Sequence, residues 1–394
     1  MSKSDLIIVG SGILGLATAF RAHQQGRRVH VIDRSARPVG SSIQNFGHAC
    51  FTGQADAAQD LAMTSRAGWR EVAAATGIWA AETGSFIPAM TEPELLVLQE
   101  FADHRGPEQA TMLSAEEAAA AIGNPSLGAI GGAHLPLDMR VDPREAAPAI
   151  ADWLAREGVG FTWNTTVTEV AGGTVSTNRG DVHGEQVVVC PGYQLTSLFP
   201  RIAETHGVRI CTLVMSLIER PPQTPTGFAM LTGTSLARYD GFAAMPGASA
   251  LREDLAQREP ELVDVIANLM VTDIADGLLI GDSHAYDLSP EPFIDERVAD
   301  LLLNRATSML GIDAPVVRQR WLGRYADSTE TNLILERPDE QTTVAVVTSG
   351  IGMTLSFGIA DRILGGETAA AGTRPTPHSS PLTPTAGEVV MSDR

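Results

Sequence analysis

Residues 6–15 read Leu6-Ile7-Ile8-Val9-Gly10-Ser11-Gly12-Ile13-Leu14-Gly15, and this stretch decides the fold. Its apolar run, residues 6–9, shows no alternation, which is typical of a parallel strand buried on both faces. Residues 13–20 continue with apolar side chains at helical spacing, and a second apolar run, residues 29–32, ends at Asp33. The order strand, glycine turn, helix and strand predicts the opening unit of a doubly wound α/β fold.

The glycines of this turn fit the pattern G-x-G-x-x-G. Gly10 allows the tight turn, Gly12 lets a pyrophosphate approach the backbone, and Gly15 lets the helix pack closely on the strand. The helix start adds free N–H groups and the positive end of a dipole. Asp33 can accept a hydrogen bond from a ribose hydroxyl. The segment predicts a dinucleotide site, and the alternative is a glycine-rich turn without a ligand.

Two further segments favour FAD over a nicotinamide nucleotide. A polar loop, residues 34–47, follows Asp33 and can lie along a pyrophosphate and a flavin. Residues 350–354 (Gly-Ile-Gly-Met-Thr) provide a second helix start late in the chain. Its N–H groups can face the N1/O2 edge of an isoalloxazine ring. A nicotinamide enzyme needs no such second site, although residues 350–354 can also be a plain loop before a helix.

Composition limits the partners and the chemistry. The chain has 394 residues, 44% of them apolar, which allows two domains. No apolar run approaches the roughly 20 residues that span a bilayer, and the N-terminus shows no secretory pattern, so we expect a cytoplasmic protein without a membrane partner. A net charge of −19 opposes binding to nucleic acid.

Lys3 is the only lysine, so an anionic substrate group must be held by Arg, by His or by backbone N–H groups. Arg suits this task because its planar guanidinium binds a carboxylate or phosphonate through two bonds. Cys50, Cys190 and Cys211 form no C-x-x-C pair, and no Cys/His group has zinc spacing. The sequence predicts neither a disulfide framework nor a metal centre.

Five motifs spread over the chain form a specific combination. They are Gly10 to Gly15 with Asp33, Ser41-Ser42 with Asn45 and Gly47, Val141-Asp142-Pro143-Arg144, residues 187–192, and Gly350 to Thr354. Together they resemble the D-amino-acid oxidase and glycine oxidase family of FAD-dependent oxidoreductases, which includes sarcosine oxidases. The resemblance implies FAD, held by Gly10, Gly12, Ile13, Leu14, Gly15, Asp33, Arg34, Ser41, Ser42, Asn45, Gly47, Val167, Cys190, Gly192, Gly350, Gly352, Met353 and Thr354. Some members of the family bind FAD covalently through His or Cys, but no Cys lies near Tyr325, so we predict non-covalent FAD.

The resemblance also implies the architecture: an α/β protein with a discontinuous Rossmann-type FAD-binding domain and a second, α+β substrate domain built on an antiparallel sheet. We assign residues 1–80, 141–212 and 325–371 to the FAD-binding domain and residues 81–140 and 213–324 to the substrate domain. Residues 372–394, which are rich in Pro, Ser and Thr, are predicted to be a disordered tail. Residues 251–274 are predicted to be helical.

In this family the flavin takes a hydride from the carbon that bears the amine, and the imine hydrolyses in water. The amino-acid oxidases hold the substrate carboxylate with the Arg of a Trp-x-Gly-x-Arg-Pro segment. Here residues 321–326 read Trp-Leu-Gly-Arg-Tyr-Ala, so Tyr325 takes that place and Arg324 is shifted by one. Such a shift turns a side chain to the opposite face of a strand. This argues against an ordinary α-amino acid, though Arg324 can recover the task in a bent loop.

Residues 44–48, 52–54, 281–286 and 323–326 are similar to a subgroup associated with aminophosphonate breakdown. The similarity implies 2-aminoethylphosphonate or its N-methyl derivative as substrate, with an aldehyde and an amine as products. Candidate substrate-binding residues are Arg238, Tyr239, Arg324 and His48, and candidate catalytic residues are His284, Tyr286 and Tyr325. Five of them have a structural alternative: a surface ion pair for the two arginines, a core position for His284 and Tyr286, and an ordinary loop position for His48.

Other functions stay open. The nearest keeps the chemistry and takes glycine, sarcosine or another small amino acid as substrate. A non-catalytic flavin-binding sensor or scaffold and a nicotinamide dehydrogenase are alternatives of other classes. The sequence leaves open the oligomeric state and the electron acceptor, which is O2 or another molecule.

Overall fold

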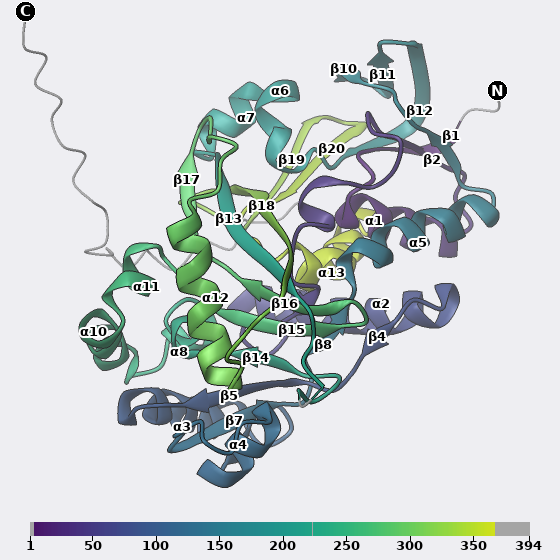
Figure 1. Ribbon diagram of the computed structural model, residues 1–394. Helices are drawn as coiled ribbons and strands as arrows, with labels where there is room; N and C mark the ends of the chain where they lie inside the picture. Colours follow the sequence, from purple (N-terminus) through teal and green to yellow (C-terminus); the bar gives the residue numbers. More distant parts are fainter. Residues whose placement is uncertain (1–3, 223, 367–394) are drawn as a thin grey trace, which may run out of the picture.

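The computed structural model describes residues 4–222 and 224–366, which form two large β-sheets and one small one (Figure 1). The predicted tail, residues 372–394, lies outside these residues. None of the helices in the described ranges combines the length and the hydropathy of a membrane span.

The first large sheet has eight strands and carries the glycine turn. Its order is β10-β11-β12-β1-β2-β9, with β20 beside β12 and β19 beside β20. Strands β9, β2, β1, β12 and β20 are parallel. The strands are β1 (Ser4–Val9), β2 (Val29–Ile32), β9 (Gly160–Thr162), β10 (Val167–Ala171), β11 (Thr174–Thr177), β12 (Gly180–Val189), β19 (Leu333–Asp339) and β20 (Thr342–Val347).

Strand β1 is buried on both faces, as its unbroken apolar run predicts. Leu6 and Ile8 pack into one hydrophobic cluster, and Ile7 and Val9 pack into the cluster on the opposite face. The first cluster includes side chains of the helices α1 (Ile13–Gln24), α2 (Asp56–Thr76), α5 (Pro143–Arg156) and α13 (Gly352–Leu364) (Figure 1). The second includes α6 (Leu195–Leu198) and α7 (Pro200–Thr205). The predicted α/β fold is confirmed.

The second large sheet has nine strands in the order β17-β13-β16-β15-β14-β5-β7-β6, with β18 also paired to β13. Its pairs are antiparallel except for β14 with β5. The strands are β5 (Ser85–Ala89), β6 (Thr111–Leu113), β7 (Gly131–Leu135), β13 (Arg209–Ile218), β14 (Ala229–Leu231), β15 (Met270–Ile274), β16 (Gly277–Gly281), β17 (Ala285–Asp287) and β18 (Val317–Asp327).

Helices cover both faces of this second sheet. Side chains of α3 (Glu92–Arg105) and α10 (Ala248–Arg258) join the cluster on one face, and α4 (Ala115–Ile122) and α12 (Glu296–Leu310) join the cluster on the other, where α12 crosses the strands in Figure 1. The remaining elements are β3 (His48–Ala49), β4 (Ala80–Ala81) and β8 (Met139–Val141), which form the small sheet, the helices α8 (Gly233–Leu236), α9 (Asp240–Ala243) and α11 (Pro260–Asp264), and the 3₁₀ turns η1 (Gly40–Ser42) and η2 (Gly192–Gln194).

The predicted helix over residues 251–274 is wrong in its second half. Helix α10 ends at Arg258, α11 ends at Asp264, and residues 270–274 form β15. Pro260 separates the two helices because it has no N–H to continue the hydrogen-bond pattern. The β-branched Val271 and Thr272 suit a strand in the interior of a sheet.

The division into domains stays a prediction. The chain crosses between the large sheets along β13 and β18, and these strands overlap the predicted boundaries at residues 212 and 324.

Candidate active site

A cavity of about 510 Å³ is lined by residues of both large sheets, and the predicted motifs meet in its wall. With the exception of Gly47, all of the predicted cofactor-binding residues line it. So do six of the predicted substrate-binding and catalytic residues: His48, Arg238, Tyr239, His284, Arg324 and Tyr325. Tyr286 does not line the cavity, but its hydroxyl accepts a hydrogen bond from Arg238, which does.

The glycine turn forms one end of the cavity. Gly10 has a φ of +102°, and an added Cβ would overlap the carbonyl oxygen of Cys190. A Cβ on Gly15 would overlap the carbonyl oxygen of Gly10, so the helix can pack this closely only without a side chain there. No side chain caps α1 from Gly12, and its first turn has no acid. Apart from the N–H of Ile13, which is donated to Ser42 Oγ at 2.8 Å, the first N–H groups of α1 are therefore open to an anion.

Asp33 lies at the end of β2, beside this helix start. Its carboxylate accepts hydrogen bonds from Ser11 N at 2.7 Å, from Ser11 Oγ at 2.8 Å and from Ser35 N at 2.8 Å. A carboxylate has about four acceptor positions, so this one is fixed in place and can still accept a bond from a ribose hydroxyl.

A second helix start, that of α13, lines the same cavity. No side chain caps α13 and its first turn has no acid, as in α1. The hydroxyl of Ser349, just before it, is buried and has no hydrogen-bond partner in the chain as described. Gly350 has a φ of +77°, and a Cβ there would lie 3.0 Å from the ring of Tyr325. Two helix starts, far apart in sequence, thus line one cavity, and their remaining free N–H groups suit a ligand with two electron-rich parts.

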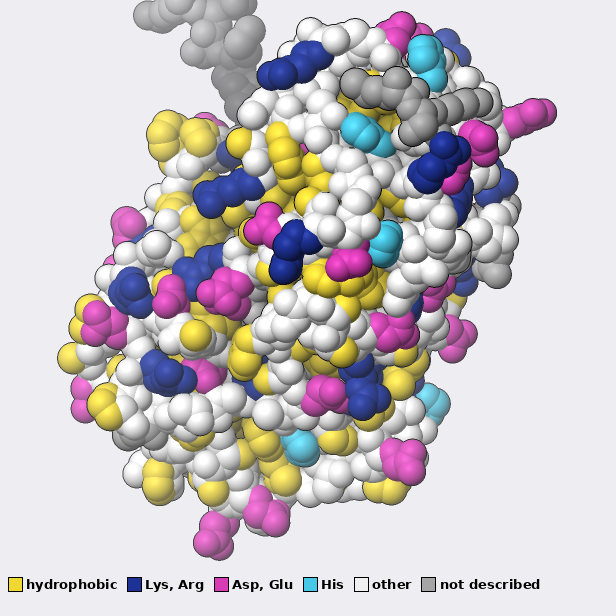
Figure 2. All heavy atoms as spheres, turned by 90° about the vertical axis from the view of Figure 1, so that its right-hand side faces the viewer, with side chains coloured by type: hydrophobic (Ala, Val, Ile, Leu, Met, Phe, Trp, Pro, Cys, Tyr) yellow, Lys and Arg dark blue, Asp and Glu magenta, His cyan; other side chains and the backbone are white. Residues whose placement is uncertain are grey.

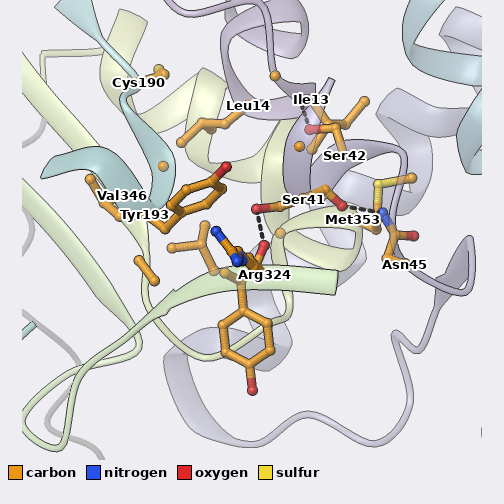
Figure 3. A pocket seen from close by; sticks show the side chains of 18 of the residues that line it. Ile13, Leu14, Ser41, Ser42, Asn45, Cys190, Tyr193, Arg324, Val346 and Met353 are labelled. Atoms are coloured by element: carbon orange, nitrogen blue, oxygen red, sulfur yellow. Dashed lines mark hydrogen bonds between the residues drawn. The ribbon is translucent and has the colours of Figure 1, made fainter. Parts of the chain in front are cut away.

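The loop after Asp33 forms the wall near both helix starts (Figure 3). Ser42 Oγ accepts a hydrogen bond from Ile13 N at 2.8 Å, and Asn45 Nδ2 donates to the Ser41 carbonyl at 2.7 Å. Ser41 Oγ donates to the backbone carbonyl of Arg324. These bonds hold the loop in place, and they join it to strand β18.

Gly47 does not line the cavity, and its role as a cofactor contact stays a prediction. Its φ is +66°, and a Cβ would overlap the carbonyl oxygen of Val141 and approach Pro143 Cδ to 2.7 Å. Gly47 N donates to Asn45 Oδ1 at 2.7 Å. The glycine therefore lets two segments of the chain cross.

Arg324 and Tyr325 are neighbours on β18 and contact different parts of the site. The side chain of Arg324 lies beside Ser41 and Tyr193 (Figure 3). The ring of Tyr325 lies over Gly350, and its centroid is 6.2 Å from that of His284. Arg324 therefore lies with the loop after Asp33, residues 34–47, and Tyr325 lies with polar residues of the second sheet.

Those polar residues form the other end of the cavity, which we call the polar end: Arg238, Tyr239, Asn268, Asp282, His284 and Tyr325. Arg238 Nη2 donates to the hydroxyl of Tyr286 at 3.4 Å. Within the described residues, no carboxylate oxygen lies within the 4.0 Å of Arg238 that defines an ion pair. Tyr286 is held in turn by the guanidinium of Arg209, 4.0 Å from its ring centroid. Arg238 is thus a positioned cation that forms no ion pair with a carboxylate of the described residues.

Burial shifts the pKa values at the polar end. It raises the pKa of Asp282 to about 8, against the opposing effect of Arg238. Burial, and then the charge of Arg238, lower the pKa of His284 well below its ordinary value. His284 Nδ1 donates to the carbonyl of Ile266 at 2.9 Å, so the neutral ring keeps Nε2 as an acceptor. Burial lowers the pKa of Arg238, but Tyr286, Tyr325 and Asp282 raise it by more, so Arg238 stays a cation.

His48 lies in β3 and is buried, so it is not the ordinary loop residue of the alternative reading. Its Nε2 is 3.4 Å from Asp138 Oδ2. Asp138 also accepts hydrogen bonds from Ser85 Oγ at 2.6 Å and from Thr52 N at 3.0 Å. His48, Cys50 and Asp138 have ligand atoms within 4.8 Å of one another. Because burial raises the pKa of the Cys50 thiol well above its ordinary value, the thiolate that a metal needs is disfavoured.

Sequence reasoning gave no role to Asn268, Met270, Tyr193 and Ser349, all of which line the cavity. Asp282 belonged to a quoted segment but was also given no role. Ser349 could have been found, because it directly precedes the predicted helix start. The others come from separate segments of the chain, and no local pattern marks them.

The face of the molecule in Figure 2 shows how the charged side chains are distributed on its described part. Acidic and basic side chains are intermixed there, with hydrophobic atoms between them and no continuous basic patch on its described part. This distribution does not favour a polyanion such as nucleic acid as a partner on this face.

Comparisons with known proteins agree with the fold. The family model described as DAO, FAD dependent oxidoreductase, matches residues 5–364. Glycine oxidase from Geobacillus kaustophilus has a similar structure, with a TM-score of 0.74, 19% identity, and coverage of 94% of this chain and 97% of that one. L-proline dehydrogenase from P. horikoshii gives a TM-score of 0.74, 17% identity, and coverage of 93% and 94%.

L-α-glycerophosphate oxidase from Mycoplasma pneumoniae, in a structure with FAD bound, gives a TM-score of 0.72, 15% identity, and coverage of 95% and 97%. No curated protein matches the sequence.

Proposed function

The chain belongs to the DAO family of FAD-dependent oxidoreductases, and from that premise we propose that it oxidises a small amine that also carries an anionic group. The observation that carries this proposal is Arg238. It is a cation without a carboxylate partner among the described residues, it is held by Tyr286, and it lines the cavity that the second helix start also lines. Such a group favours a substrate that brings its own negative charge.

The residues of the cavity fit FAD. The open N-terminus of α1 suits the pyrophosphate, and Asp33 suits the ribose of the adenosine half. Ser349, with its unpaired hydroxyl, and the N-terminus of α13 suit the N1/O2 edge of the isoalloxazine ring. When bound, FAD supplies the acceptor for a hydride. Burial raises the pKa of the Cys190 thiol to about 12, which keeps it unreactive and favours non-covalent binding.

We propose that Arg238 binds the anionic group of the substrate and that Tyr286 keeps the guanidinium in position. Tyr325, in the cavity wall, offers its hydroxyl group to the same anion, while Tyr239 lines the cavity beside it with its hydroxyl donated to Met270 Sδ. His284 keeps a neutral ring with a free acceptor nitrogen, which suits a contact to the amine or to a bound water. Arg324, beside Ser41 and Tyr193, is assigned to the dinucleotide instead of the substrate (Figure 3).

Two considerations favour an aminophosphonate, either 2-aminoethylphosphonate or its N-methyl derivative. The position that carries the carboxylate-binding Arg in related oxidases holds the uncharged Tyr325, which lies over Gly350. The segments at residues 44–48 and 281–286 resemble the aminophosphonate subgroup, and both contribute to the cavity wall. Glycine oxidase and L-proline dehydrogenase, which have similar structures, are named for amines with a carboxylate, and such an amine is the alternative substrate.

The test is anaerobic mixing of the yellow protein with 2-aminoethylphosphonate, its N-methyl derivative, glycine and sarcosine, while the flavin absorbance is followed. We expect the two phosphonates to bleach the flavin. Bleaching by glycine or sarcosine alone would assign the alternative substrate class. A bound flavin that none of the four amines reduces would point to a sensor or scaffold. Admission of air afterwards reports whether O2 is a competent acceptor.

A further inference from the structure

Asp282 has an environment that the chain itself does not satisfy. It follows β16 directly, lines the polar end, and is 5% exposed. Its backbone is fixed by two hydrogen bonds, from Asp282 N to the Asn268 carbonyl at 3.1 Å and from Asn268 N to the Asp282 carbonyl at 2.9 Å. Its Oδ1 is buried and has no hydrogen-bond partner in the described structure. A rigid backbone therefore presents an unpartnered carboxyl oxygen at a cavity.

The neighbours of Asp282 do not use this oxygen. His284 Nδ1 is 3.8 Å from Oδ1, but its proton is donated to the Ile266 carbonyl at 2.9 Å. The Tyr239 hydroxyl donates to Met270 Sδ at 3.7 Å. The charge of Arg238 acts on Asp282 from a distance, since no ion pair between them forms within 4.0 Å. Cys211, the other titratable group coupled to Asp282, is a buried thiol whose pKa burial raises to about 12.

Burial without a partner is unfavourable for a carboxyl group, and such groups are found where a ligand completes them. Asp282 and Arg238 line the same end of one cavity, so that end offers one acidic and one basic group. A substrate with an anion at one end and an ammonium at the other complements this pair. The anion is the part already assigned to Arg238.

We propose that Asp282 is a catalytic residue that binds the ammonium of the substrate and takes one of its N–H protons. This inference rests on the proposed amine oxidation. In the step, an N–H bond breaks, an O–H bond forms on the Asp282 carboxylate, and the electron pair stays on nitrogen. The neutral amine can then release its C–H hydrogen as a hydride, with two electrons, to the acceptor that FAD provides.

The ionisation of Asp282 fits this sequence. Burial raises its pKa to about 8, so near pH 7 the free protein holds a protonated carboxyl. An entering ammonium favours the carboxylate, and one proton then passes to solvent. Among the facing titratable groups, His284 is neutral and Tyr239, whose pKa burial raises well above its ordinary value, is neutral too. The lowered pKa makes the free nitrogen of His284 a weak base, whereas the Asp282 carboxylate, once an ammonium favours it, is the stronger base of the two.

The experiment compares ligand binding to the holoenzyme after anaerobic reduction with dithionite, because a reduced flavin cannot oxidise the ligand. Calorimetry gives the dissociation constants of 2-aminoethylphosphonate and of ethylphosphonate, which lacks the amine. We expect Asp282→Asn to weaken binding of the amine at least tenfold and to change binding of ethylphosphonate less than twofold. Asp287→Asn, an exposed acid on β17, is the matched control and should change neither.

A second readout separates a base from a structural group. In the wild type, the rate of flavin reduction at low amine concentration should rise with pH and level off above about pH 8. In Asp282→Asn it should keep rising tenfold per pH unit, because the amine must then lose its proton in solution. The proposal is overturned if Asp282→Asn retains flavin and loses affinity for both ligands equally. It is also overturned if the flavin-bound variant keeps the pH profile of the wild type.

If Asp282→Asn does not retain flavin, Asp282→Glu, which keeps the carboxylate, replaces it in the binding experiment. Preserved preference for the amine over ethylphosphonate supports the proposal, and loss of that preference in the flavin-bound variant overturns it. If the wild-type flavin is bleached by glycine and not by the phosphonates, glycine and acetate replace the two ligands. If no amine bleaches the wild-type flavin, the proposed function itself fails, and the role of Asp282 fails with it.

Discussion

Arg238→Met removes the charge that the proposed function depends on and keeps a side chain of similar reach. Arg238 is half-buried, donates to Tyr286 at 3.4 Å and has no carboxylate partner in the described chain. Each charge-assisted hydrogen bond to a substrate anion contributes ~1.5–3 kcal/mol net. About 1.4 kcal/mol corresponds to a tenfold change in the dissociation constant. Loss of one such bond should therefore weaken substrate binding by roughly 10- to 150-fold, and loss of a bidentate pair should weaken it by more.

The assay is anaerobic stopped-flow reduction of the flavin over a range of 2-aminoethylphosphonate concentrations. We expect the concentration that gives half the maximal rate to rise by the factor above, because the anion is bound before and during hydride loss. The substitution should also raise the pKa of Asp282 above about 8, since the charge of Arg238 opposes the effect of burial. The pH profile of reduction should shift to the alkaline side accordingly.

Arg318→Met is the matched control. This exposed arginine on β18 donates to the Asp276 carbonyl at 2.7 Å and does not line the cavity. The control should leave both the saturation curve and the flavin spectrum unchanged. The reasoning is refuted if Arg238→Met binds flavin normally and is saturated at the wild-type concentration of amine.

Three other predictions concern the cofactor and stability. Gly350→Ala should lower the flavin content, measured as the flavin-to-protein absorbance ratio, because φ is +77° and the added Cβ would lie 3.0 Å from the ring of Tyr325. Gly26→Ala is the control, since Gly26 has a similar φ of +74° and an added Cβ would meet nothing within 4 Å. Acid precipitation should release all of the flavin into the supernatant, because the pKa of Cys190 is raised to about 12, and colour that stays with the pellet would argue for a covalent bond. The native pKa of Asp282 is about 8 and its ordinary value is 3.8, so the native state binds an extra proton between these values and the free energy of unfolding falls as pH rises. Asp282→Asn should remove that slope, as thermal unfolding from pH 5 to pH 8 would report, and an unchanged slope would contradict the buried, protonated carboxyl.

The dinucleotide part of the cavity could be predicted from the sequence because its determinants are local. Gly10, Gly12 and Gly15 mark a turn whose geometry excludes a side chain, and the strand and helix on either side have clear apolar periods. The late helix start at residues 350–354 has the same local character. Such segments carry their physical reason within a few residues, so their pattern alone indicates the structure.

The polar end could be predicted only in part, because its residues meet through the tertiary fold. Arg238, Asn268 and Asp282 belong to different segments: Arg238 follows α8, whereas Asn268 and Asp282 flank the paired strands β15 and β16, and the tertiary fold brings all three to one cavity. The ion-pair distance between His48 and Asp138 depends in the same way on β3 pairing with β8. The close approach of Val141 to Gly47, which excludes a side chain there, also arises from the tertiary fold.

The crystal structure of the purified yellow protein tests the central claim most directly. The account predicts one FAD, with its pyrophosphate at the N-terminus of α1 and the N1/O2 edge of its isoalloxazine ring at the N-terminus of α13. The ring would then face Tyr325 and the polar end. A dinucleotide whose ring lies away from residues 350–354, or a cavity filled by a nicotinamide nucleotide, would contradict the account.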